Sequence, residues 1–80
     1  MIAASQIKAA RAMLGLSQRQ LAELASVGLA TVQRIELSTN IRGAAETVWK
    51  IQTALEEAGV EFIPADDTKG PGVRLKQRQR

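Results

Sequence analysis

Residues 16–36 constrain the fold of this chain more than any other stretch, because two apolar patterns of helical spacing lie close together there. The apolar positions that recur at the spacing of a helix face are Leu21, Leu24, Ala25, Val32 and Ile35. Residues 26–28 separate the two patterns and are long enough only for a sharp corner. The stretch therefore predicts two short amphipathic helices that meet at a tight turn.

Polar residues at the start of the first of these helices support the prediction. Ser17 precedes the pattern as an N-cap, and Gln20 stands three residues later, where the partner of a capping box belongs. Two helices joined by a turn of about 3–4 residues form a helix-turn-helix, whose second helix enters the major groove of DNA. The stretch therefore indicates a DNA-binding unit.

The composition excludes several other classes of protein. The chain has 80 residues, enough for one small domain, and contains no cysteine and no histidine. The absence of cysteine excludes disulfides and thiolate metal sites. The absence of histidine removes the commonest general base and metal ligand. No apolar run approaches the length of a transmembrane helix. We therefore expect a cytoplasmic protein that is not an enzyme, binds no metal, cofactor or small-molecule ligand, and contacts no membrane.

The charges are divided along the chain. The first fifty residues carry a net positive charge, residues 51–68 contain only acidic charged side chains, and residues 69–80 contain only basic ones. Binding to a phosphate backbone requires a basic surface, although a solvated surface would explain a net charge of +3 equally well. The acidic residues of the middle segment could be catalytic carboxylates only with a companion base or metal, and the sequence offers neither. A solvated acidic surface is therefore the better interpretation there.

Two further helices flank this unit. We expect one over about residues 5–14, with Ser5 as its N-cap and Gly15 at its end. The other is expected over about residues 45–58, where Gly59 ends it. Their inward positions are Ile7, Ala10, Leu14, Val48, Ile51, Ala54 and Leu55.

After the last helix the pattern changes from helical to extended. Residues 60–63 and residues 72–76 have the β-branched and alternating composition of two short strands, which predict a β-hairpin. A two-stranded hairpin is marginal alone in water, so it must pack on a helix or pair with another copy. The chain then divides into a helix-turn-helix domain at residues 1–59, a hairpin at residues 60–76 that serves as a dimerisation element, and a basic tail at residues 77–80.

Several residues match the pattern of a known family in ungapped register. They are Arg11, Leu14-Gly15-Leu16-Ser17-Gln18, Leu21-Ala22, Thr31-Val32 and Arg34-Ile35-Glu36. On this basis residues 6–59 resemble the Cro/C1-type (Xre) helix-turn-helix family, which includes phage repressors and small bacterial regulators. The resemblance implies a mainly α, lambda-repressor-like bundle of four helices, here with a short C-terminal β-hairpin, that binds double-stranded DNA as a dimer. The third helix, residues 28–36, would be the recognition helix.

The resemblance also implies which residues contact DNA. They are Gln18, Arg19, Gly28, Leu29, Ala30, Thr31, Gln33, Arg34, Thr39, Asn40 and Arg42. Gln18 and Arg19 at the start of the second helix would bind phosphates, and ordinary exposed side chains are the alternative. Gln33 and Arg34 carry the hydrogen-bonding capacity of the third helix, since glutamine suits adenine and arginine suits guanine, although Arg34 could equally bind a phosphate.

Four positions in the family register have a structural role, and one of them, Gly28, is also among the expected DNA contacts. Arg11 and Glu36 lie where the family forms a buried ion pair, which is a structural role. Ser26 stands in the turn where glycine is usual. Gly28 stands where a serine or threonine commonly caps the recognition helix, and glycine is the weaker cap.

A homodimer is expected, because one small reading unit offers too few contacts for tight specific binding. Trp49 points away from the inward stripe of its helix, so it lies either under the C-terminal segment or against a partner. The candidates for the dimer interface are Trp49, Val60, Phe62, Val73 and Leu75. The predicted function is that of a sequence-specific repressor or controller on a pseudo-palindromic operator. The alternative is an antitoxin or anti-activator that acts through protein contacts of the hairpin.

Overall fold

The computed structural model describes residues 2–38 and 45–76, which form four α-helices and one β-hairpin. The helices are α1 (Ala4–Leu14), α2 (Gln18–Ala25), α3 (Leu29–Leu37) and α4 (Ala45–Glu57), and the strands are β1 (Val60–Ile63) and β2 (Gly72–Leu75). The predicted mainly α fold with a C-terminal hairpin is confirmed. The expectations for Thr39, Asn40, Arg42 and the tail at residues 77–80 lie outside the described residues.

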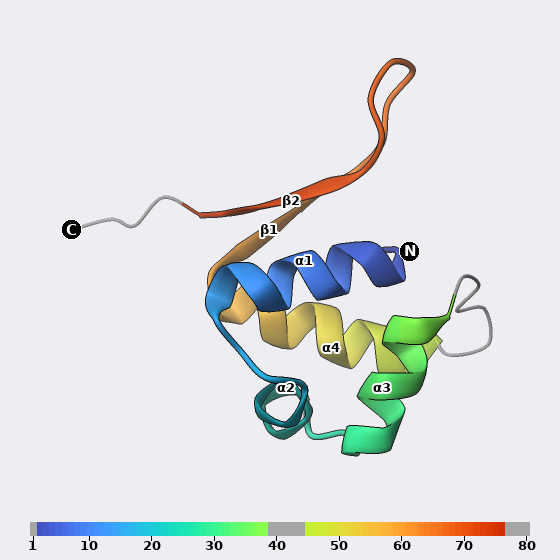
Figure 1. Cartoon of the computed structure of the whole chain (residues 1–80). Helices are drawn as coiled ribbons and strands as arrows, with labels where there is room; N and C mark the ends of the chain where they lie inside the picture. Colours follow the sequence, from blue (N-terminus) through green and yellow to red (C-terminus); the bar gives the residue numbers. More distant parts are fainter. Residues whose placement is uncertain (1, 39–44, 77–80) are drawn as a thin grey trace.

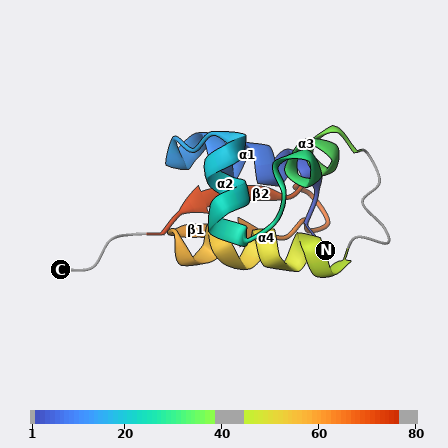
Figure 2. The ribbon, with the colours of Figure 1, turned by 90° about the horizontal axis from the view of Figure 1, so that it is seen from below.

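The helix-turn-helix and the hairpin lie on opposite sides of a central helix pair. Figure 1 shows α1 and α4 side by side, with α2 and α3 below them and the hairpin above. In the view from below, α2 lies across the space between α1 and α4, and α3 lies beside α2 and against α1 (Figure 2). The hairpin packs on this pair through two contacts, β2 on α1 and β1 on α4.

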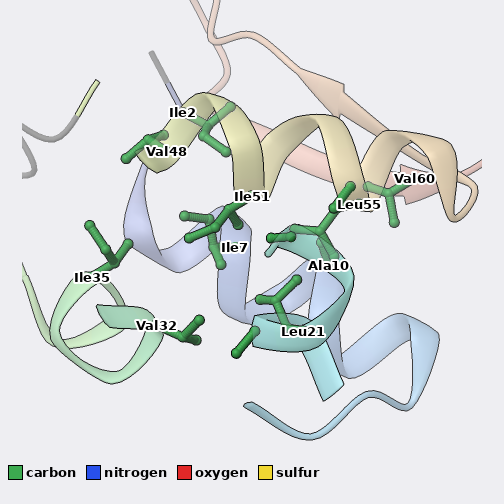
Figure 3. Close-up of a cluster of buried hydrophobic side chains, with 13 residues drawn as sticks. Ile2, Ile7, Ala10, Leu21, Val32, Ile35, Val48, Ile51, Leu55 and Val60 are labelled. Carbon is green, nitrogen blue, oxygen red and sulfur yellow. The ribbon is translucent and has the colours of Figure 1, made fainter. Parts of the chain in front are cut away.

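The core lies between the helices and is built from aliphatic side chains. Side chains of all four helices and of β1 point toward one another in Figure 3. The largest completely buried side chains are Ile7, Leu21, Val32, Val48, Ile51, Leu55 and Val60. Burying one such side chain contributes about 1.5–3 kcal/mol. The inward stripes predicted for α1 and α4 are confirmed, with Leu14 half-buried at the rim.

Five large apolar side chains of the described residues are exposed, and two of them, Leu24 and Trp49, bear on the predictions. The expectation that Leu24 faces inward is wrong, because 53% of its surface is exposed. The short α2 buries Leu21, Ala22 and Ala25, and Leu24 falls at the uncovered edge of that stripe. Trp49 is 64% exposed, so the C-terminal segment, as far as residue 76, does not cover it.

The start of α1 differs from the prediction. The helix begins at Ala4, its N-cap is Ala3, and Ser5 is an exposed residue of the first turn, so the assignment of Ser5 as N-cap is wrong. The cap is supplied by Gln6 instead, whose Oε1 accepts a hydrogen bond from the Ala3 N–H at 2.8 Å. The end of the helix is as predicted, since Gly15 adopts a left-handed conformation with φ of 70°.

The hairpin is closed onto the helices by the same glutamine. The strands pair antiparallel with Val60 opposite Leu75 and Phe62 opposite Val73, and β2 ends one residue earlier than expected. The buried Gln6 Nε2 donates to two hairpin carbonyls, Gly72 O at 3.0 Å and Ile63 O at 3.4 Å. Of the two alternatives for the hairpin, the structure therefore shows packing on a helix.

The placement of Val60 in the dimer interface is wrong, because this side chain is completely buried in the core of its own chain. Phe62 and Val73 are half-buried and pack against that core. Leu75, with 47% of its surface exposed, is the apolar hairpin side chain among these four that remains open to a partner. Most of the apolar surface of the hairpin is therefore packed against the core of its own chain.

Candidate nucleic-acid interface

The N-terminus of α2 is fixed by the capping box that the sequence predicts. Ser17 Oγ accepts from the Gln20 backbone N–H at 3.0 Å, and the Ser17 N–H donates to Gln20 Oε1 at 2.8 Å. Two of the four N–H groups that a helix start leaves without helical partners are thereby accounted for. The first turn of α2, which carries Gln18 and Arg19, therefore has a defined position.

The corner between α2 and α3 contains a residue in an unusual conformation. Ser26 has φ of 58°, in the left-handed region that favours glycine. The turn is closed by backbone hydrogen bonds from the Ser26 N–H to Glu23 O and from the Val27 N–H to Ala22 O. The serine therefore fulfils the role of the usual glycine, but at a conformational cost of about 1 kcal/mol.

The N-terminus of α3 has no side-chain cap. Gly28 is the N-cap residue, and its carbonyl accepts from the N–H groups of Thr31 and Val32. α3 extends to Leu37, one residue beyond the predicted end. The missing cap leaves N–H groups at this tip available to a negatively charged group.

The surface of α3 divides into exposed and half-buried positions. Gly28, Ala30, Gln33 and Arg34 are exposed, and Thr31 is half-buried. Leu29 is also half-buried and packs against the core, so only part of this side chain faces outward. The hydrogen-bonding groups at the exposed positions of this helix belong to Gln33 and Arg34.

A buried ion pair joins α1 to the end of α3. Arg11 Nε donates to Glu36 Oε2 at 2.8 Å and Arg11 Nη2 donates to Glu36 Oε1 at 3.0 Å, which is a bidentate arrangement. Arg11 Nη1 also donates to the carbonyl of Leu16 at 3.0 Å. The structure thus contains the ion pair that the resemblance implies, and the pair also holds the link between α1 and α2.

Gln18 is part of the same network, which sequence reasoning did not anticipate. Its Nε2 donates to Glu36 Oε1 at 3.0 Å, so that one carboxylate binds side chains from α1 and α2. A carboxamide has a second N–H and an acceptor oxygen, which can still reach a ligand. We call these three residues, Arg11, Gln18 and Glu36, the Glu36 cluster.

The Glu36 cluster holds the carboxylate in its charged form. Burial raises the pKa of Glu36, but hydrogen bonds from Arg11 and Gln18 and the positive charges of Arg11 and Lys8 outweigh burial, so that the pKa lies below its ordinary value. The cluster also places the first turn of α2 beside α3. Gln18 and Arg19 are therefore held next to the helix that carries Gln33 and Arg34.

A metal site and a membrane-spanning helix are both absent from the described residues. Within residues 2–38 and 45–76, no group of three histidine, cysteine or acidic side chains is arranged to hold a metal ion. No described helix is both long enough and apolar enough to span a membrane.

The arrangement defines a class of protein. A capped helix, a sharp corner and a second helix with an exposed polar face form a helix-turn-helix, the element by which many regulators bind DNA. The model of the Cro/C1-type helix-turn-helix family matches residues 7–61, and the chain belongs to this family of DNA-binding transcription regulators. The family is not typically enzymatic. No curated protein matches the chain.

Proposed function

We propose that this protein is a repressor or controller that binds a pseudo-palindromic operator as a homodimer, with α3 in the major groove of each half-site. The observation that carries the proposal is the Glu36 cluster, which fixes Gln18 at the start of α2 beside the exposed face of α3. A fixed phosphate anchor beside a reading helix is the geometry by which such motifs set the register of their base contacts. Since the ligand is the chromosome, we place the protein in the cytoplasm.

The proposed contacts divide into positioning and reading. Gln18, Arg19 and Thr31 bind phosphates, and the expectations for Thr39, Asn40 and Arg42 remain of this kind. Gln33 and Arg34 contact base edges, where arginine fits the N7 and O6 acceptors of guanine and glutamine fits adenine. Gly28 and Ala30 let the helix approach closely, and the exposed part of Leu29 contacts thymine methyl groups.

The dimer follows from the size of the reading surface. Two exposed hydrogen-bonding side chains on α3 discriminate few base pairs, whereas two copies double the site. Half-sites of a dimer of this class lie about one helical turn of DNA apart. The operator is therefore expected to be an inverted repeat with that spacing.

The test is a selection from random DNA, followed by binding measurements on the selected sequence over a range of salt concentrations. Arg34→Ala should weaken specific binding by about 1–3 kcal/mol and relax the preference at one base pair of each half-site. Gln18→Ala should weaken binding to all sequences alike with little change in the dependence on salt, because glutamine carries no charge, whereas Arg19→Ala should also reduce that dependence. The matched control is Arg74→Ala, which removes an exposed arginine of the hairpin and should leave DNA affinity unchanged. Selection of no sequence, or equal loss from Arg34→Ala and Arg74→Ala, would contradict the proposal.

A further inference from the structure

An open groove of about 220 Å³ lies between the C-terminal end of α2 and the middle of α4. The lining residues used below are Leu24, Trp49, Lys50, Thr53, Ala54 and Glu57. We call it the α2–α4 groove. It brings together two of the large apolar side chains that the fold leaves exposed, since Leu24 is 53% and Trp49 is 64% exposed. Exposed leucine and tryptophan side chains that line one groove of a small domain are typical of an interaction site.

The groove also carries one positive and one negative charge. Lys50 and Glu57 both line it, seven residues apart on α4, which separates them by about 10 Å along the helix axis. Within the described part of the chain neither side chain has an ion-pair partner. The small residues Thr53 and Ala54 lie midway between them.

The midpoint between Lys50 and Glu57 falls between Thr53 and Ala54, in the C-terminal half of α4. We propose that the α2–α4 groove binds a second copy of this chain, with the two α4 helices antiparallel and a twofold axis between Thr53 and Ala54. Lys50 then faces Glu57 of the second copy, and Glu57 faces Lys50 of the second copy, which is the reciprocal contact that a twofold interface requires. The small, half-buried Thr53 at the crossing lets the helices approach closely, and Trp49 packs over the apolar surface around Leu24 of the second copy.

The position of the groove permits DNA binding and self-association together. Gln18 begins α2 and Leu24 lies near its other end, about 10 Å further along the helix axis. A second copy seated at Leu24 leaves the phosphate-binding end of α2 open. This inference rests on the proposed function, because it assumes that the protein acts as a homodimer, and it adds the surface through which the dimer forms.

A charge-swap experiment tests the reciprocal contact directly. Lys50→Glu alone and Glu57→Lys alone each place like charges opposite one another at both ends of the interface, so each variant should dimerise about tenfold more weakly than wild type. A mixture of the two variants restores both opposite-charge contacts and should form a heterodimer of nearly wild-type affinity, as should the double variant with itself. Both positions are exposed, so circular dichroism should show unchanged folds.

The readout is built into the chain, because Trp49 is its single tryptophan. Its fluorescence should shift to shorter wavelength as the dimer forms on concentration, and sedimentation equilibrium gives the dissociation constant. Wild-type affinity in both single variants, or a mixture that associates no better than either variant alone, would overturn the proposal.

Two matched leucine substitutions separate this groove from the hairpin. Leu24→Ala should weaken the dimer by about tenfold or more, whereas Leu75→Ala, at a similarly exposed position on β2, should leave it unchanged. The reverse result assigns the dimer to the hairpin and overturns the inference. A wild-type chain that selects an operator but shows no groove-dependent dimer refutes the inference alone, while a groove dimer that selects no operator refutes the proposed function alone.

Discussion

Among single residues, Glu36 combines a negative charge with almost complete burial, and its partners come from two other helices. Replacing it by alanine leaves the Arg11 guanidinium and the Gln18 carboxamide without their acceptor. Breaking a buried ion pair in this way costs about 3–5 kcal/mol, and the lower end is expected because Arg11 is 23% exposed. Glu36→Ala should therefore unfold at a clearly lower temperature, as measured by circular dichroism.

The control for that substitution is the exposed ion pair of the hairpin. Glu61→Ala removes the partner of Arg74, both of them on the surface, and the melting temperature should hardly change. If Glu36→Ala melts like wild type and only its DNA binding is lost, the structural role of the Glu36 cluster is refuted.

The lowered pKa of Glu36 makes stability depend on pH in a defined direction. A pKa below the ordinary value of 4.5 adds stability at higher pH, and this contribution is lost as the pH falls through the lowered value. The free energy of unfolding should therefore decrease as the pH is lowered below about 4.5, and it should decrease less in a Glu36→Gln variant. Urea denaturation between about pH 6 and pH 3 measures both. Glu61 and Asp66 also have lowered pKa values, so the difference between the two proteins isolates Glu36; parallel curves would contradict the assignment.

Two turn residues allow a reciprocal exchange. Ser26→Gly relieves a left-handed serine and should raise the free energy of unfolding by about 0.5–1 kcal/mol. Gly15→Ser places a side chain at φ of 70°, where no steric clash interferes, and should lower it by a similar amount. Chemical denaturation compares the two. Equal signs for both changes would show that the backbone conformation is not the cause.

At the scale of elements, the hairpin depends on one side chain of α1. Gln6→Ala removes the donor to the carbonyls of Ile63 and Gly72, together with the acceptor that caps α1. The loss should cost about 1–3 kcal/mol, because buried polar groups lose their partners. Amide hydrogen exchange should show lost protection at β1 and β2 before α2 and α3. Uniform loss over all elements would mean that the hairpin is not a separate cooperative unit.

Sequence patterns located the elements well where the signal is local. The Ser17 capping box and the glycines at 15 and 59 set helix ends, because each acts within one turn of backbone. Leu24 was misplaced because periodicity defines a stripe but not how much of it a neighbour covers. Gln6 gave no signal, since its hairpin acceptors lie 57 and 66 residues away in sequence.

The sequence predicted part of the candidate DNA-binding interface and missed another part. The family register placed Arg11 opposite Glu36, and the ion pair is present. The link from Gln18 to Glu36 was not anticipated, because a glutamine at the start of a helix has several equally plausible partners. In the sequence, only the outward position of Trp49 indicated the α2–α4 groove. The α2 side of the groove depends on which edge of α2 remains uncovered, and the sequence pattern does not define that edge.

At the scale of the whole molecule, the hairpin is part of the core rather than an appendage. A chain ending at residue 59 loses the buried Val60, worth about 2 kcal/mol, and leaves Gln6 without its hairpin acceptors. It should therefore be largely unfolded, whereas a chain ending at residue 76 keeps every described contact and should melt like the full chain. Circular dichroism distinguishes them. A folded monomer from the shorter chain would show that the hairpin is dispensable.

The closure of Gln6 onto Gly72 also has a consequence for the synthesis of the chain on the ribosome. α1 is made before the other described elements, but its hydrogen-bond acceptor on β2 follows Gln6 by 66 residues. At roughly 5–20 residues per second, the helices wait on the order of one to a few seconds for β2 after α4 is complete. During that interval the nascent bundle has an uncovered side, so its native state is reached only after β2 has been made.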